Sequence, residues 1–291
     1  MKPAPFAYER PGDLSALLAR LADAPGRVKL MAGGQSLGPM LNLRLVEPDL
    51  VLDITGVPEL RRAAIEGDTL VLGACVTHAD IEDGRVPDVT KGAMARVASA
   101  IAYRPVRNRG TLGGSLVHAD PAADWVTSLV ALGAEVELAS ASGRRRLALD
   151  AFVTGALDVA LAPGEMLVAV RIPGLGPGIA WGYVKHCSKI GEFAHAIGAV
   201  RLDPGAGHGR VVIGAVEGAP LLVPEARHLF GGRIGPDFAD RFEAAAADAL
   251  LREAGMTDAV ARHVHVTVLA RAVAQAATTL FAPTRTVSEA A

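Results

Sequence analysis

The segment Val28-Lys29-Leu30-Met31-Ala32-Gly33-Gly34-Gln35-Ser36-Leu37 places a short apolar run directly before a double glycine. The run predicts a buried strand over residues 28–31, and the glycines predict a tight turn after it. A second apolar run ends at Val51-Leu52-Asp53. The pattern therefore predicts a strand, a glycine turn, a short helix and a second strand.

A second double glycine follows about eighty residues later, in Asn108-Arg109-Gly110-Thr111-Leu112-Gly113-Gly114-Ser115-Leu116. In both segments a hydroxyl side chain and a leucine stand close behind the glycines. Paired glycines let backbone N–H groups approach a phosphate without a Cβ in the way, and the serines add neutral donors. Two such turns suggest one long ligand, and the alternative is that both are only tight turns.

Two familiar nucleotide motifs are excluded. Gly33 and Gly38 have P-loop spacing, but Pro39-Met40 stands where Lys and Ser or Thr must stand. The same glycines match the outer positions of GxGxxG, and Asp53 lies near the distance of a ribose-binding acid. However, Gln35 replaces the middle glycine and Pro39 leaves only a short helix, so a Rossmann fingerprint is not expected.

The rest of the chain alternates short strand and helix patterns, and Pro173–Gly178 is a Pro/Gly stretch at which we place a domain boundary. The predicted domains are 1–177, with subdomains of about 1–56 and 57–177, and 178–285. Helices are expected after Asp13, over 78–83 and 87–99, from a cap at Asp120 with Pro121 at the first position, and over 237–254 and 257–280. Strands are expected within 60–73, 135–138, 145–149, 179–186, 196–202 and 209–216, and 288–291 is expected to fray.

Composition indicates a packed protein without a nucleic-acid partner. Of the 291 residues, 51% are hydrophobic and 21% are charged, which argues against long disordered regions. The 29 basic and 31 acidic residues give a net charge of -2, and no long basic run is present. No segment of 18 uninterrupted apolar residues predicts a membrane span. A reducing cytoplasm is the expected compartment.

The two cysteines, Cys75 and Cys187, are far apart and form no CxxC. Neither a zinc site nor an iron–sulfur cluster can be built from this pattern. We expect no metal site in the chain, so any cluster with which the chain works would belong to another subunit.

The double-glycine segments belong to a longer series of matching motifs. The series comprises Ala32–Leu37, Asn42-Leu43-Arg44-Leu45, Val106–Leu116, Ala119–Asp124, Tyr183-Val184-Lys185 and Lys189–Ala194. In order and spacing these motifs closely resemble the medium, FAD-binding subunit of molybdenum hydroxylases, a family that includes relatives of carbon monoxide dehydrogenase and xanthine dehydrogenase. The likeness runs from about Pro5 to the C-terminal helices.

The resemblance implies the vanillyl-alcohol-oxidase type of FAD fold. In it, two α+β subdomains hold the extended cofactor between them, and a C-terminal domain of antiparallel sheet and helices closes one side. Carried over by position, it implies that both glycine turns surround the FAD pyrophosphate and the adjoining sugar chain. The residues implied there are Ala32, Gly33, Gly34, Gln35, Ser36, Leu37, Thr111, Leu112, Gly113, Gly114 and Ser115.

Further positions match flavin contacts of the family. Asp124 matches a ligand of the flavin chain, so we expect Asp120 to be the helix cap and Asp124 to accept from a hydroxyl. Lys185 matches a lysine that reaches the cofactor, where a cation would raise the potential of a reduced, anionic flavin. Its alternative is a solvated surface lysine. Ile101 and Leu167 match apolar contacts and Lys29 matches a residue at the adenine end, with ordinary core or surface as the alternative.

The sequence departs from the family pattern at two adjacent positions. Glu192 replaces the usual Asp, and Phe193 occupies a position that varies near the flavin. We expect both to affect access of the electron acceptor.

The function implied by the resemblance is electron transfer. A large molybdenum subunit would hydroxylate the substrate, a small subunit with two-iron two-sulfur clusters would pass on the electrons, and the FAD of this chain would deliver them to an external acceptor. Two copies of each subunit are expected. No catalytic acid or base is expected here, because the cofactor supplies the redox chemistry. The alternatives are a stand-alone FAD-dependent reductase of the same fold and a non-redox assembly subunit.

Overall fold

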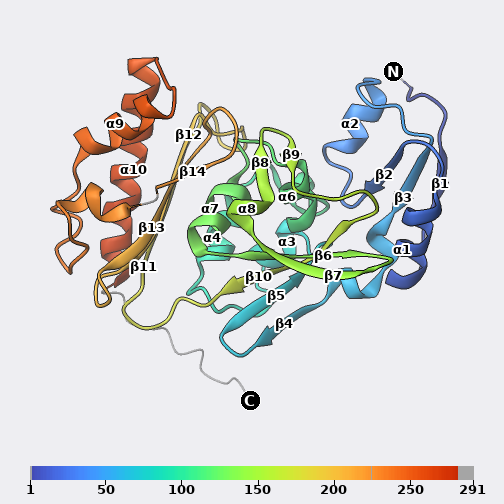
Figure 1. Cartoon of the computed structure of the whole chain (residues 1–291), viewed down its shortest axis with the longest axis horizontal. Helices are drawn as coiled ribbons and strands as arrows, with labels where there is room; N and C mark the ends of the chain where they lie inside the picture. The colour runs from blue at the N-terminus through green and yellow to red at the C-terminus, as the bar shows by residue number, and fades with distance from the viewer. Residues whose placement is uncertain (1, 224, 281–291) are drawn as a thin grey trace.

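The computed structural model describes residues 2–223 and 225–280. Three main sheets follow one another along the molecule, with helices between and outside them (Figure 1). The predicted end of the second domain at residue 285 and the predicted fraying of 288–291 lie outside the described residues.

The N-terminal sheet has three parallel strands in the order β1–β3–β2. Asp13 caps the first helix by accepting a hydrogen bond from the Ala16 amide at 2.8 Å, which satisfies one of the free donors of the first turn. The predicted strand, glycine turn, short helix and strand are confirmed. The elements are β1 (Ala7–Glu9), α1 (Leu14–Asp23), β2 (Val28–Met31), α2 (Leu37–Asn42) and β3 (Leu50–Asp53), followed by η1 (Ile54–Gly56) and η2 (Pro58–Arg61).

The second sheet has five antiparallel strands in the order β4–β5–β10–β6–β7. Its strands are β4 (Ala63–Glu66), β5 (Thr69–Gly73), β6 (Glu135–Ser140), β7 (Gly143–Ala148) and β10 (Met166–Pro173). Between β5 and β6 the chain forms α3 (His78–Glu82), α4 (Ala93–Ser99), α5 (Arg104–Arg107), α6 (Leu112–His118) and α7 (Asp124–Leu132). A short helix α8 (Leu149–Phe152) and the pair β8 (Val153–Gly155) and β9 (Asp158–Val159) lead to β10.

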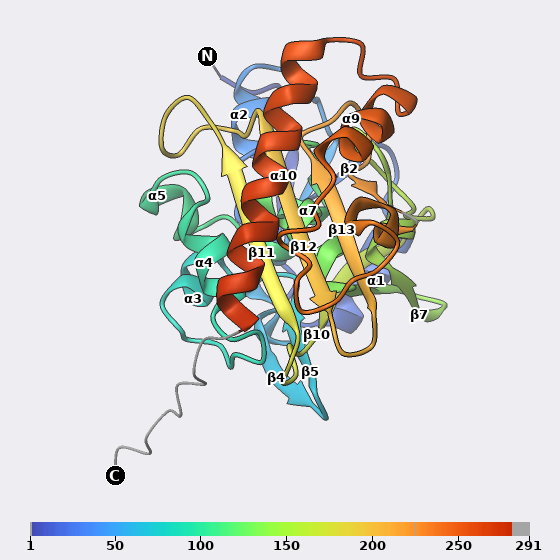
Figure 2. The same ribbon diagram turned by 90° about the vertical axis from the view of Figure 1, so that its left-hand side faces the viewer.

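The third sheet is also antiparallel and follows its sequence order. Its elements are β11 (Ala180–His186), β12 (Ala196–Asp203), β13 (His208–Gly214) and β14 (Leu221–Leu222), with η3 (Ala226–Phe230), α9 (Ala244–Glu253) and α10 (Ala259–Leu280) after them. Figure 2 shows α10 lying along the outer face of this sheet. Within the described part of the chain, no helix is long and apolar enough to span a membrane.

Helix α7 is the centre of the fold. All nine of its residues are buried. It packs against β12 and β13 on one side and against β10 on the other, so it lies between the second and third sheets. The large hydrophobic core therefore includes side chains from both sheets, and α10 covers a second core on the outer face of the third sheet.

The predicted start of α7 is wrong. The helix begins at Asp124, with Ala123 as its N-cap, and Asp120 instead accepts a hydrogen bond from the Ala122 amide within a turn. The Pro121 carbonyl accepts a hydrogen bond from the Ala215 amide in the C-terminal part of the chain. This tertiary contact occupies an oxygen that a helix starting at Asp120 would use internally.

Two further helices begin later than predicted. The Asp88 carboxylate accepts hydrogen bonds from Thr90 and Gly92 and forms a turn, so α4 begins at Ala93. Phe238 is fully buried edge-to-face on Phe230, which keeps the chain in short turns, so α9 begins at Ala244. In both cases side-chain anchoring replaces the expected first helical turns.

Close packing of α10 on the third sheet depends on a glycine. A Cβ at Gly182 in β11 would lie 1.8 Å from the carbonyl oxygen of Ala272. We expect Gly182→Ala to lower the free energy of unfolding by about 1–3 kcal/mol, because a backbone oxygen cannot move aside cheaply. Urea unfolding measures the change. Gly176→Ala is the matched control, since a Cβ there meets nothing within 4 Å, and equal losses in both variants would contradict the packing role.

Candidate functional site

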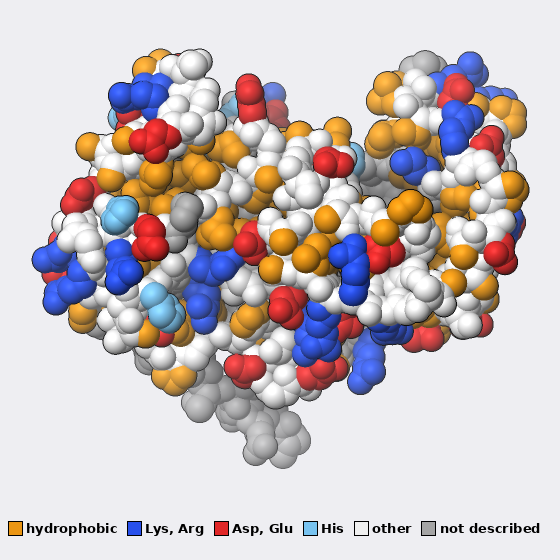
Figure 3. Space-filling model, in the orientation of Figure 1, with side chains coloured by type: hydrophobic (Ala, Val, Ile, Leu, Met, Phe, Trp, Pro, Cys, Tyr) orange, Lys and Arg blue, Asp and Glu red, His pale blue; other side chains and the backbone are white. Residues whose placement is uncertain are grey.

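A cavity of about 520 Å³ lies between the N-terminal sheet and the rest of the molecule. It is lined by residues within 29–40, 101–124, 161–167 and 191–193, and by Ile54, Ala74 and His78. Figure 3 shows the surface hollowed beside the lobe that carries α2. The volume falls within the roughly 300–1,000 Å³ of small-molecule sites.

The first glycine turn presents unused backbone donors to this cavity. Gly34 has a left-handed backbone with φ of 71°, which turns successive amides toward one side. Among the described residues, the backbone N–H groups of this turn donate no hydrogen bond. They belong to Gly33, Gly34, Gln35 and Ser36. The turn therefore has free backbone donors, as an anion-binding nest for phosphate requires, and we call it the nest below.

The second glycine turn has a different structure. Thr111 caps α6 and accepts a hydrogen bond from the Gly114 amide at 3.0 Å, while the amides of Leu112 and Gly113 donate to the carbonyls of Val76 and Ala74. Because these amides are already bonded, the segment offers the cavity its side-chain hydroxyls and the start of a short helix.

Both double glycines also allow close contact between segments. A Cβ at Gly33 would lie 2.0 Å from the carbonyl oxygen of Arg109, and a Cβ at Gly113 would lie 2.6 Å from the Cβ of Ala74. The first contact brings the two turns together, and the second seats α6 on the end of β5. The glycines thus build the cavity as well as line it.

Most of the predicted site residues do lie at this cavity. Those that line it are Lys29, Ala32, Gly33, Gly34, Gln35, Ser36, Leu37, Ile101, Thr111, Gly113, Gly114, Ser115, Asp124 and Leu167. Leu112 is fully buried in the core and Lys185 stands behind the wall, so neither lines it.

Asp124 carries a buried carboxylate to the cavity from the start of α7. It is 8% exposed, and its Oδ1 accepts hydrogen bonds from the hydroxyl of Tyr183 and from Lys185 Nζ, the latter at 2.9 Å. Burial raises the pKa of Asp124, and the charge of Lys185 opposes this rise. Burial and the Asp124 charge raise the pKa of Tyr183 well above its usual value. Lys185 therefore acts on the cavity through Asp124.

Other polar residues of the cavity were not predicted. The Glu165 carboxylate pairs with Arg145 at 2.7 Å, which holds the pKa of Glu165 at about 2. His78 also lines the cavity and is 5% exposed. The only sequence signal near His78 is the capping box of Thr77 and Asp80, which marks the start of α3 and says nothing of a ligand.

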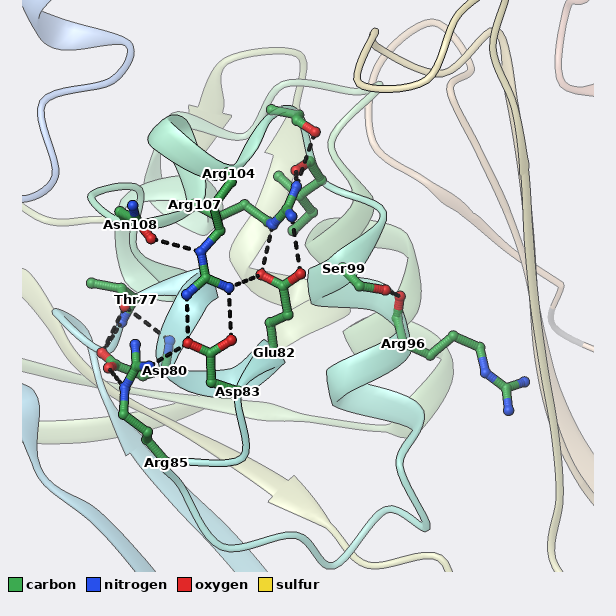
Figure 4. A network of polar contacts seen from close by, with 12 residues as sticks. Thr77, Asp80, Glu82, Asp83, Arg85, Arg96, Ser99, Arg104, Arg107 and Asn108 are labelled. Carbon is green, nitrogen blue, oxygen red and sulfur yellow. Dashed lines mark hydrogen bonds and ion pairs between the residues drawn. The ribbon is translucent and has the colours of Figure 1, made fainter.

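An ion-pair network holds the wall beside Ile101 (Figure 4). Arg107 makes a two-pronged pair with Glu82 at 2.8 and 2.9 Å, and its Nη1 donates to the carbonyls of Ile101 and Ala102 at 3.0 and 3.1 Å. Ala102 has a left-handed φ of 41°, which an alanine rarely adopts unaided. Lys185 Nζ donates to the neighbouring Ala100 carbonyl at 2.7 Å. Two cations thus fix three successive carbonyls of the wall.

We expect Arg107→Lys to loosen this wall, because an ammonium cannot make the two-pronged pair and also reach both carbonyls. The variant should bind the expected FAD about tenfold more weakly, and its thermal midpoint should fall. Fluorescence titration of the flavin and a melting curve measure both changes. Arg96→Lys is the matched control, because Arg96 is exposed in the same region and points away from the network (Figure 4). Unchanged affinity in Arg107→Lys would contradict the positioning role.

Comparisons with known proteins identify the family of this chain. Residues 4–175 match the family described as the FAD binding domain in molybdopterin dehydrogenase. The chain is 34% identical to the caffeine dehydrogenase subunit beta of Pseudomonas sp. (strain CBB1), over 81% of this chain and 82% of that one. It is also 34% identical to the carbon monoxide dehydrogenase medium chain of Hydrogenophaga pseudoflava, over 86% and 88%.

A solved structure extends the likeness to nearly the whole chain. A chain of quinoline 2-oxidoreductase from Pseudomonas putida 86 superposes with a TM-score of 0.84 at 31% identity, covering 97% of this chain and 100% of that one. The predicted α+β flavoprotein fold and the FAD cofactor are confirmed. The chain belongs to the FAD-binding medium subunits of the molybdenum hydroxylases, and it is the flavoprotein component of an oxidoreductase.

Proposed function

We propose that this chain takes electrons from iron–sulfur clusters of a small partner subunit and passes them through its FAD to an external acceptor. A large molybdenum-binding subunit would oxidise the substrate, and the complex would hold two copies of each subunit. The observation that carries the proposal is a cavity in which the first glycine turn has unused backbone amides, while the carboxylates of Asp124 and Glu165 are paired with Lys185 and Arg145.

The residues of the cavity fit the parts of FAD. The unused amides around Gly34 suit the pyrophosphate, which is dianionic. With Oδ1 of Asp124 occupied by Tyr183 and Lys185, the second carboxylate oxygen is left to accept from a hydroxyl of the sugar chain. Ile101 and Leu167 supply apolar wall for a ring system. FAD would supply the redox chemistry of the site.

The carboxylates at the cavity have hydrogen-bond or ion-pair partners within the protein. Asp124 is engaged by Lys185 and Glu165 by Arg145. Asp120 accepts from the Ala122 amide, and Glu192 accepts from the Lys189 amide. A general base needs a carboxylate free to take a proton at the working pH. Asp124 and Glu165 are each paired with a cation inside the protein, which supports a binding role for these two carboxylates.

The need for partner subunits is supported by the side chains that this chain has for metal binding and by the names of its relatives. In residues 2–223 and 225–280, no three His, Cys, Asp or Glu side chains form a metal-binding group. Burial raises the pKa of Cys75 to about 12, so its thiol is a poor ligand. The carbon monoxide dehydrogenase relative is named a medium chain and the caffeine dehydrogenase relative a subunit beta. Both cysteines are free, and we also propose a reducing cytoplasm as the compartment.

The first glycine turn is open to a direct test. We expect Gly34→Val to lower the FAD content of the purified chain at least tenfold, because a β-branched residue cannot hold a φ of 71° and the nest would open. The fold should survive, since a Cβ at Gly34 has only ordinary contacts with Met31 at 3.7 Å. The ratio of flavin to protein absorbance measures the effect.

Gly38→Ala is the control for this change. Gly38 follows in α2, and a Cβ there meets nothing within 4 Å. It should keep full FAD content. Full content in Gly34→Val as well would remove the first turn from the binding site.

Dependence on partners tests the proposed electron path. The FAD-loaded chain alone should oxidise no aromatic heterocycle, aldehyde or carbon monoxide with a dye as acceptor. Co-expressed with a large molybdenum subunit and a small iron–sulfur subunit from the same genome, it should co-elute with them, and substrate should then reduce its flavin. Absorbance of the flavin during anaerobic substrate addition measures this reduction.

The alternatives give different results in the same experiment. Substrate oxidation by the chain alone, or flavin reduction by a nicotinamide nucleotide with transfer to an unsaturated substrate, would identify a stand-alone reductase. An assembled complex that turns over while its flavin stays oxidised would identify an assembly role.

A further inference from the structure

His78 is a buried side chain at the cavity that no part of the proposed electron path uses. It is the first residue of α3, where the Thr77 and Asp80 capping box fixes the helix start. The residue is 5% exposed and lines the cavity together with Gly110 and Thr111. A buried polar side chain at a ligand cavity requires a partner, since an unmade hydrogen bond there is costly.

The protonation state of one ring nitrogen of His78 is fixed by a hydrogen bond from a neighbouring side chain. The indole Nε1 of Trp125, in the first turn of α7, donates to His78 Nδ1 at 3.0 Å. Trp125 is fully buried, and an indole N–H can only donate. Nδ1 must therefore be the unprotonated acceptor, and in a neutral ring the proton resides on Nε2.

The ring is neutral at ordinary pH. Burial and the nearby charge of Arg107 lower the pKa of His78 to about 4. Above that pH the ring carries one proton, and the bond from Trp125 keeps it on Nε2. His78 is thus a neutral donor with a fixed tautomer.

The donor nitrogen is directed into the binding site. Within the described part of the chain Nε2 has no hydrogen-bond partner, and it is not among the unpartnered side-chain atoms that are sealed from solvent. Those sealed atoms are Thr127 Oγ1, Trp181 Nε1 and Arg201 Nε. Nε2 therefore keeps access to the cavity that His78 lines.

The glycines around His78 leave this nitrogen uncovered. A Cβ at Gly110 would lie 2.8 Å from Nε2, so a larger residue would cover it. A Cβ at Gly33, in the nest, would lie 2.9 Å from the Cα of Gly110. The donor and the first glycine turn therefore both lie beside Gly110.

Resting on the FAD site proposed above, we propose that His78 binds the cofactor, donating its Nε2 proton to an oxygen of the FAD pyrophosphate beside the first glycine turn. The neutral ring adds a directed donor without adding a positive charge. Trp125 is a positioning residue in this arrangement, because it sets the tautomer from the central helix α7.

Two substitutions separate the donor role from the structural role. The amide nitrogen of Gln reaches roughly the place of His Nε2, whereas the amide oxygen of Asn stands roughly at Nδ1 and leaves the Nε2 place empty. We expect His78→Asn to weaken FAD binding roughly tenfold to hundredfold, the effect of losing a hydrogen bond to a charged acceptor. His78→Gln should recover much of that loss. Titration of FAD into the full-length apoprotein measures both.

The control is another buried histidine. His265 is 3% exposed in α10, with its ring nitrogens near the carbonyls of Ala261 and Ala215 and away from the cavity. His265→Asn should keep the wild-type affinity for FAD, even if its melting temperature falls. Equal affinity in wild type, His78→Asn and His78→Gln, or equal loss in both His78 variants, would overturn the proposal.

Nitrogen NMR of the wild-type chain gives a test that needs no folded variant. With 15N-labelled histidine, His78 should show a protonated Nε2 and a bare Nδ1. Its Nε2 proton should exchange slowly with water when FAD is bound and rapidly after FAD is removed. A proton on Nδ1, or an Nε2 proton whose exchange is the same with and without FAD, would overturn the proposal.

Discussion

The burial of α7 between two sheets is the constraint on which the rest of the structure depends. Because all nine residues are buried, every polar group at its ends needs a partner inside the protein. At the start of α7, Asp124 accepts hydrogen bonds from Tyr183 and Lys185 of β11. The Trp125 indole donates a hydrogen bond to His78 of α3. A negative charge also suits the N-terminus of a helix. The helix that joins the sheets thus places Asp124 at the cavity, and the third sheet contributes to the site through Tyr183 and Lys185, which bond to Asp124.

The cavity is shaped by backbone contacts that only glycine permits. Gly33 lies against Arg109, Gly110 against His78 and Gly113 against Ala74, each at a distance where a Cβ would collide. The first contact joins the N-terminal glycine turn to the segment before α6, and the other two fix the segments that follow β5. Gly34 differs from them, because its left-handed φ forms the nest that exposes free amides. Glycines that look alike in the sequence therefore have two physical roles, close packing and amide orientation.

The charged groups near the cavity act mainly on one another and on the backbone. Glu82 fixes Arg107, and Arg107 in turn fixes the carbonyls of Ile101 and Ala102. Lys185 fixes Asp124 and the carbonyl of Ala100. Charged pairs with little exposure are costly to separate, so they make the wall rigid. A rigid pocket suits a cofactor that performs the redox step itself.

The sequence by itself determined the strand and glycine-turn unit at 28–53 and most strands of the three sheets, but it gave no signal for β1, β10 or β14. The predicted strands depend on local apolar runs that the sequence displays directly, whereas the family and its cofactor followed from the resemblance of the motif series. It also named Gly34 and Asp124, which line the cavity. Only the tertiary structure decided that α7 starts at Asp124, since the Ala215 amide takes the Pro121 carbonyl. It also decided that Lys185 pairs with Asp124 behind the wall and that His78 faces the cavity. These features depend on partners 47 to 94 residues away along the chain, and no local pattern encodes which of many buried polar groups will meet.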